Sequence, residues 1–216
     1  MASSTLLTDP ALPVVADTSA IINLNSSGHA PEIVRALPNK LVVVNAVPTE
    51  LDDGRERGRL DADLLDSLVA AGLIEIVRLN DSCAIHFEKL VVGPASMTLD
   101  DGEAATIAYA FVHEGIAIID ERKATRICGE MFPELRIGST VDILAHPDVW
   151  RSLGKQLLAE AVLNALRNGR MRVLPHHVEW VVDLIGPEQA ASCASLPNRV
   201  RKLQENFAAP PTTRHK

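Results

Sequence analysis

The stretch "PVVADTSAI", residues 13–21, places the apolar residues Val14 to Ala16 directly before an aspartate, Asp17. An apolar, β-branched run that opens with a proline predicts a short buried strand. The stretch "IAIID", residues 116–120, repeats this arrangement and ends on Asp120. Because the carboxyl ends of parallel strands open on the same edge of a sheet, we expect Asp17 and Asp120 to lie at one rim.

Three further stretches predict strands: "KLVVVN" (40–45), "LIEIVRL" (73–79) and "LRIG" (135–138). Segments with helical spacing separate them, and strands that are apolar throughout are typical of a parallel sheet with helices on both faces. Beyond "HPDVW" only helical patterns follow, and the sequence ends in the polar stretch "AAPPTTRHK". We therefore expect an α/β domain over residues 12–149, a C-terminal helical extension over 150–206 and a flexible tail over 207–216.

The composition disfavours several classes of protein. The chain of 216 residues has a formal charge of −7 at pH 7 and only 3% aromatic residues, so a nucleic-acid binder built on aromatic stacking is not expected. No apolar run approaches the roughly 18 residues of a membrane span, and the N-terminus lacks the basic and apolar regions of a secretory signal. Three cysteines far apart in sequence argue against a disulfide framework. We expect a cytoplasmic protein without a membrane segment.

Two glutamates accompany the strand-end aspartates. Glu50 lies early in the helix predicted after residues 40–45, and Glu103 lies in the first turn of the helix predicted for "LDDGEAATIAYAFVHEG". The acids also have structural explanations, because an aspartate after a strand is a good helix N-cap and "DDGE" fits a capping box with Asp100 at the N-cap. If all four acids converge, two carboxylates about 5 Å apart repel each other by about 3 kcal/mol at an effective dielectric constant of 20. A hard divalent cation, Mg²⁺ or Mn²⁺, would relieve this repulsion.

Four segments resemble the PIN-domain ribonuclease family in their order and spacing: "ADTSAIINL", "VPTEL", "LDDGEAATIAYA" and "AIIDERKATRIC". The "GEA" stretch and the later "GSTVDIL" look most similar to a prokaryotic subgroup related to the toxins of VapBC-type toxin–antitoxin pairs. The resemblance covers roughly residues 12–186. It implies a three-layer α/β/α sandwich with a central parallel sheet and C-terminal helices. It also implies a metal-dependent endoribonuclease that hydrolyses the phosphodiester bonds of RNA.

The resemblance also implies roles for individual residues. Mg²⁺ or Mn²⁺ would be held by Asp17, Glu103 and Asp120, and Glu50 would complete the acidic pocket from the opposite side. The hydroxyl of Ser19 would support Asp17 or a phosphate, and Thr140 would supply a second hydroxyl. The sequence departs from the family pattern at three acids that compete with these for the metal: Asp100, Asp101 and Glu121.

The expected partners follow from the same resemblance. RNA is the expected substrate. Two basic stretches, "GRERGR" (54–59) and "ERKATR" (121–126, with Arg122 and Lys123), follow predicted site acids, so they suit a track for RNA phosphates; the alternative is that they are solvated helix faces. The toxin subgroup implies a small antitoxin protein as a partner and is compatible with a homodimer. A phosphatase of the haloacid-dehalogenase type is disfavoured, because it needs a second aspartate where this chain has Ser19. A PIN-like module that binds RNA or protein without cutting remains the alternative.

Overall fold

The computed structural model describes residues 6–55 and 57–201. Its centre is a five-stranded sheet in which neighbouring strands are parallel and the order is β3-β2-β1-β4-β5. The strands are β1 (Val14–Ala16), β2 (Leu41–Val44), β3 (Ile74–Val77), β4 (Ile116–Ile118) and β5 (Arg136–Gly138). All five lie within the stretches predicted from the sequence.

The apolar stretches form the middle of the sheet because helices cover both of its faces. Every residue of β1, β2 and β4 is buried. The edge strand β3 instead exposes Glu75 and Ile76, which agrees with its weaker apolar pattern. In the register between the central strands, Ala16 lies opposite Ile118, so β1 and β4 end side by side.

Helices fill the connections between the strands. In chain order they are α1 (Thr18–Ser26), α2 (Ala30–Ala36), α3 (Ala46–Arg55), α4 (Asp61–Ala70), α5 (Asp81–Val91), α6 (Asp101–Val112), α7 (Arg122–Met131), α8 (Thr140–Leu144), α9 (Pro147–Asn168), the 3-10 helix η1 (Pro175–His177), α10 (Val178–Ile185), α11 (Pro187–Ala191) and α12 (Asn198–Arg201).

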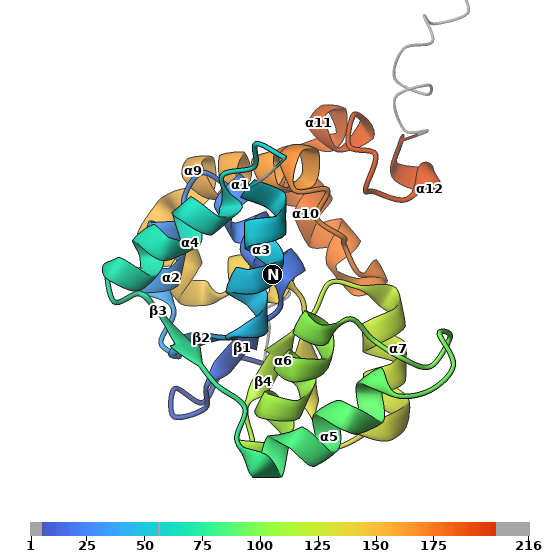
Figure 1. Cartoon of the computed structure of the whole chain (residues 1–216). Helices are drawn as coiled ribbons and strands as arrows, with labels where there is room; N and C mark the ends of the chain where they lie inside the picture. The colour runs from blue at the N-terminus through green and yellow to red at the C-terminus, as the bar shows by residue number, and fades with distance from the viewer. Residues whose placement is uncertain (1–5, 56, 202–216) are drawn as a thin grey trace, which may run out of the picture.

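The helices form one layer on each side of the sheet. Helix α6 packs across β1, β2 and β4, and α5 and α7 pack against it (Figure 1). Helices α1 and α2 pack together with α9, and α4 packs on β3 and α1. The three-layer α/β/α architecture predicted from the sequence is therefore confirmed.

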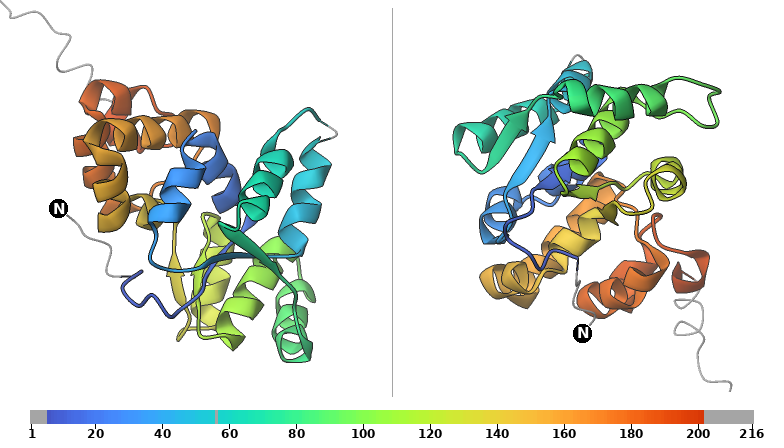
Figure 2. Two further views of the ribbon diagram at one scale, coloured as in Figure 1. Left: turned by 90° about the vertical axis from the view of Figure 1, so that its left-hand side faces the viewer. Right: turned by 90° about the horizontal axis from the view of Figure 1, so that it is seen from below.

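The helices that follow the sheet continue the layer formed by α1 and α2. Helix α9 contains a break at Gly154, whose φ of 69° and ψ of 172° are not helical, and its buried side chains join the single hydrophobic core. Helix α10 packs on α9 and α11 packs on α10, so these helices gather at one end of the molecule (Figure 2). The division of the chain at residues 149 and 150 stays a prediction, and the tail at 207–216 lies outside the described residues.

Two local features bear on expectations from the sequence. Helix α5 falls in a stretch for which the sequence predicted no element, and Asn80 caps it by accepting a hydrogen bond from the backbone N–H of Cys83. The three cysteines are free and buried, as expected for small apolar side chains in a protein without a disulfide framework. Within the two described ranges, no helix has both the length and the apolar character needed to cross a membrane.

Candidate active site

The strand order creates a natural position for a site. The chain passes from β1 outward to β2 and β3, and then returns to the other side of β1 to form β4 and β5. The connections on the two sides of this reversal lie on opposite faces of the sheet. A crevice therefore opens beyond the carboxyl ends of β1 and β4, where ligands bind in open α/β folds. Asp17 and Asp120 stand at this position, as the sequence predicted.

Asp17 follows β1 directly and is only 1% exposed. Its carboxylate accepts a hydrogen bond of 2.7 Å from the backbone N–H of Ala20 and bonds of 2.8 and 2.9 Å from the hydroxyl of Ser19. It is therefore the N-cap of α1, so the capping explanation applies to the same residue as the predicted site role. Burial raises the pKa of Asp17 to about 8, and the negative charges of Asp120 and Glu103 add to the increase.

Asp120 is held by a different set of donors. Its Oδ1 accepts 3.0 Å from the backbone N–H of Thr140, and its Oδ2 accepts from the Thr140 hydroxyl and, at 2.7 Å, from Nδ2 of Asn23. Burial raises the pKa of Asp120, and these hydrogen bonds oppose the increase. Thr140 thus touches the predicted pocket. Asn23, in α1, is a site neighbour that the sequence did not indicate.

Glu103 lies in the first turn of α6, close enough to influence Asp17. Burial raises the pKa of Glu103 to about 7, the charge of Asp100 adds to this, and a hydrogen bond from the backbone of Asp100 opposes it. The predicted capping box is only half present, because Asp100 is the N-cap residue but its side chain makes no capping hydrogen bond. The charge of Glu121 also raises the pKa of Glu103, and the charge of Lys123 lowers it.

Glu50 approaches the site from α3, after β2. Its Oε1 accepts 2.7 Å from the backbone N–H of Gly102, and its Oε2 accepts from the hydroxyl of Thr18. Thr18 and Gly102 are the chain neighbours of Asp17 and Glu103, so Glu50 ties the starts of α1 and α6 together. A Cβ at position 102 would lie 2.6 Å from the Glu50 carboxylate. The glycine of "DDGEA" is therefore what lets this acid reach the backbone of α6.

The donor chemistry of the site fits a hard cation. Among the described residues, every group that donates a hydrogen bond to Asp17 or Asp120 is neutral: backbone N–H groups, hydroxyls and one amide. The atoms available as ligands are carboxylate and hydroxyl oxygens, which Mg²⁺ and Mn²⁺ prefer. Burial is the largest cause of the raised pKa values of Asp17, Glu103 and Asp120, because removal from water favours the protonated form of a carboxylate.

The remaining predicted residues lie at the border of this site. Asp100, Asp101 and Glu121 are exposed, whereas Asp17 and Asp120 are buried. Glu121 caps α7 by accepting a hydrogen bond of 3.4 Å from the backbone N–H of Lys123. Arg122 is exposed and lines a cavity that also reaches Asp120 and Ser19.

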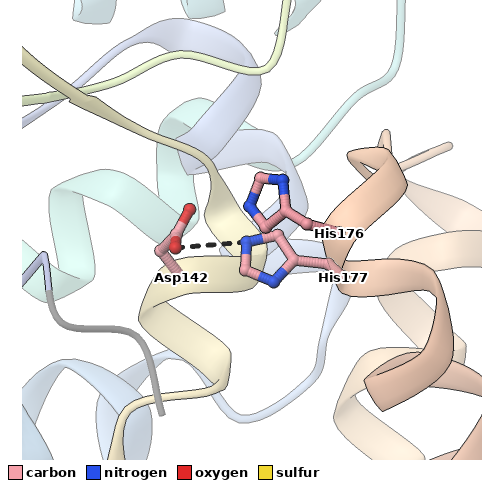
Figure 3. Close-up of side chains that lie close together, drawn as sticks. All are labelled: Asp142, His176 and His177. Atoms are coloured by element: carbon pink, nitrogen blue, oxygen red, sulfur yellow. Dashed lines mark ion pairs between the residues drawn. The ribbon is translucent and has the colours of Figure 1, made fainter. Parts of the chain in front are cut away.

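A second polar cluster, which the sequence pattern did not predict, joins η1 to α8. His177 in η1 is 5% exposed, and its Nε2 lies 3.1 Å from Oδ1 of Asp142 in α8 (Figure 3). With the exposed His176, these are three potential metal ligands within 4.8 Å of one another. Burial raises the pKa of Asp142, but hydrogen bonds from His177 and Ser139 outweigh it and lower the pKa to about 2. Only the S-x-x-D spacing of Ser139 and Asp142 marked this region in the sequence.

Comparison with known proteins agrees with the fold. The family model DUF3368, described as a PIN domain, matches residues 13–187. The chain belongs to the PIN-domain family. No curated protein and no solved structure matches it. This PIN domain thus has a nuclease fold, and the family match spans β1 to the start of α11, including all four predicted acids.

Proposed function

We propose that this PIN domain is a metal-dependent endoribonuclease. The observation that carries the proposal is the pair Asp17 and Asp120, buried at the ends of adjacent parallel strands with only neutral donors among the described residues. When both are ionised, their repulsion calls for a cation. A cation beside a strand-end crevice is suited to chemistry on a phosphodiester.

In this proposal Asp17, Glu103 and Asp120 hold Mg²⁺ or Mn²⁺, which when bound activates water and stabilises charge on the phosphate. The protein's own residues fix the geometry. Asn23 and Thr140 hold both oxygens of Asp120, and Ser19 orients Asp17. Glu50 holds the start of α6 in place and thereby positions Glu103.

The test is an RNA-cleavage assay with purified protein. We expect cleavage of single-stranded RNA with Mg²⁺ or Mn²⁺, none with excess EDTA, and a loss of at least about 100-fold for Asp17→Asn, since removal of a group that stabilises the transition state typically costs this much. Asp183→Asn, an exposed aspartate in α10, is the matched control and should cleave like wild type. RNA binding without cleavage under every metal condition would instead support the non-catalytic alternative.

The toxin role is a further part of the proposal and rests on the resemblance of the "GEA" and "GSTVDIL" stretches. A small cognate antitoxin would cover the acidic site. Induction of the wild-type chain in a bacterial host should then arrest growth, whereas Asp17→Asn should not. Equal growth with both chains, in cells where the wild-type protein is intact and active after purification, would contradict the toxin role.

A further inference from the structure

A cavity of about 370 Å³ lies directly beside the acidic site and shares Ser19, Asn23 and Asp120 with it. Its walls carry four arginines, drawn from three separate parts of the chain: Arg59, Arg122, Arg170 and Arg172. Asp120 and Glu121 are the acids in the same wall. Four guanidinium groups against two carboxylates make this a local basic site in a chain whose formal charge is −7.

The segment that follows α9 is built to reach this cavity. A Cβ at position 169 would collide with Oδ1 of Asn23 and would lie 2.9 Å from the carbonyl oxygen of Ala165, so only glycine allows the segment to approach α1 so closely. Arg170, the next residue, has a φ of 56°, a left-handed conformation that is unfavourable for an arginine.

Contacts among the described residues leave guanidinium donors of these arginines available for a ligand. Arg172 donates 3.1 Å to the backbone carbonyl of Asp120, which leaves most of its fork free. Within the described ranges, neither Arg122 nor Arg170 forms an ion pair, whereas Arg59 pairs with Asp61 at 3.0 Å. Arg122 and Arg172 lie close enough for their charges to repel each other, and Asp120 and Glu121 carry the opposite charge in the same wall.

We propose that this cavity binds a phosphate group of the RNA strand beside the one that is cleaved, with Arg170 and Arg172 as its main contacts. The choice of RNA rests on the proposed function, while the preference for a phosphate rests on the cavity itself. Guanidinium groups match phosphate oxygens with paired hydrogen bonds. Asp120 belongs both to the wall of this cavity and to the acidic site. An RNA strand with one phosphate in the cavity therefore has its neighbouring phosphate next to the carboxylates.

The contribution of Arg170 can be separated from its effect on folding. Arg170→Gly removes the guanidinium and also relieves the left-handed backbone, so its melting temperature should equal or exceed that of wild type. Arg172→Gln tests the second contact. Arg136→Gln is the matched control, because Arg136 is exposed at the first residue of β5, on the edge of the sheet opposite to the site.

Binding is measured by fluorescence anisotropy with a labelled single-stranded RNA that carries a 5′-hydroxyl, so that the signal reports internal phosphates. The measurement uses Asp17→Asn as background and several salt concentrations. We expect Arg170→Gly and Arg172→Gln each to weaken binding by about 3- to 10-fold and to lower the slope of log K against log salt by about 0.7, the value for one lost phosphate contact on a single strand. Arg136→Gln should change neither quantity.

The outcomes separate this inference from the proposed function. If the arginine variants bind with unchanged affinity and salt slope, the inference is wrong even if wild type cleaves RNA. If the variants lose affinity as expected but wild type never cleaves with any metal, the phosphate site stands and the nuclease proposal fails. A loss of affinity in Arg170→Gly that accompanies a lower melting temperature would assign the effect to misfolding and overturn the inference.

Discussion

At the scale of single residues, Gly102 shows how the acidic site depends on backbone access. Its N–H donates to Glu50, and the Glu50 carboxylate occupies the space that a Cβ would need. Because this carboxylate is the end of a flexible side chain, added volume at position 102 would displace Glu50 rather than break the fold.

We therefore predict that Gly102→Ala impairs activity more than stability. One lost hydrogen bond costs about 1 kcal/mol, and the better helix propensity of alanine offsets it by about the same amount, so the free energy of unfolding should change by less than about 1 kcal/mol. Cleavage should fall by at least about tenfold, since small misplacements near a reacting centre are costly. Urea denaturation and the RNA-cleavage assay measure the two effects.

Gly129→Ala is the control for this prediction. Gly129 lies inside α7 and a Cβ there would meet nothing within 4 Å, so alanine should raise stability by about 0.5–1 kcal/mol and leave cleavage unchanged. Full activity in Gly102→Ala would show that the position of Glu50 does not matter to the reaction.

The residues of the site divide by how they could be recognised in sequence. Asp17 and Asp120 end apolar runs, which is a local pattern that predicts both the strand and the rim. Asn23, Arg170 and Arg172 reach the site only because α1 and the segment after α9 meet there. No local spacing encodes such a meeting, so no sequence pattern marks these three residues.

At the scale of elements, the strands were predictable and α5 was not. Buried strands leave continuous apolar stretches, whereas α5 packs on α6 and leaves Ile85 59% exposed, with Val92 just after it 74% exposed. The apolar positions of α5 alone therefore do not identify the face that it buries. The contact between Asp142 in α8 and His177 in η1 was not predicted either, because it is a polar contact between elements that are distant in sequence.

The contact between Asp142 and His177 should contribute measurably to the free energy of unfolding. Asp142 accepts two hydrogen bonds of 2.8 Å from Ser139 and pairs with His177, so it both caps α8 and fastens η1 to it. We predict that Asp142→Asn lowers the free energy of unfolding at pH 6 by about 1–3 kcal/mol, since it removes a buried, hydrogen-bonded charge. A double-mutant cycle with His177→Gln should give a coupling energy above about 0.5 kcal/mol.

The pH dependence of this effect has a definite sign. The pKa of Asp142 falls from its ordinary value of 3.8 to about 2 on folding, so its contribution is fully present above about pH 4 and is lost as the pH falls toward 2. The difference between wild type and Asp142→Asn in urea denaturation should shrink between pH 6 and pH 3. A constant difference over this range, or an equal loss in the exposed control Asp183→Asn, would contradict the assignment.

At the scale of the whole molecule, the strand order decides where the acids meet. Periodicity predicted five strands and a parallel sheet, and the structure adds the full strand order, in which the chain crosses back over β1 to place β4 beside it. That crossing brings together Asp17 and Asp120, which lie about a hundred residues apart. Folding therefore brings ionisable carboxyl groups together in the core, so the stability of the molecule should depend on whether they are protonated.

We predict that, without divalent cations, stability falls as the pH rises from about 5 to about 8. The pKa values of Asp17 and Glu103 rise on folding from 3.8 and 4.5 to about 8 and about 7, so in this interval the folded state binds more protons than the unfolded state. Stability decreases with pH wherever this holds, because each proton must be removed from the folded protein at a cost. Thermal melts in EDTA across this range measure the effect.

Divalent cations should oppose this loss where the carboxylates are ionised. A cation at 100 times its dissociation constant stabilises the folded state by about 2.7 kcal/mol. Because protons compete for the same oxygens, Mn²⁺ or Mg²⁺ should raise the melting temperature more at pH 8 than at pH 5.5. Asp17→Asn keeps an N-cap acceptor for α1 but removes one charge, so it should melt higher than wild type in EDTA at pH 8 and respond less to the cation. A melting temperature that is independent of pH and of cation in both proteins would mean that the four acids do not form a common charged site.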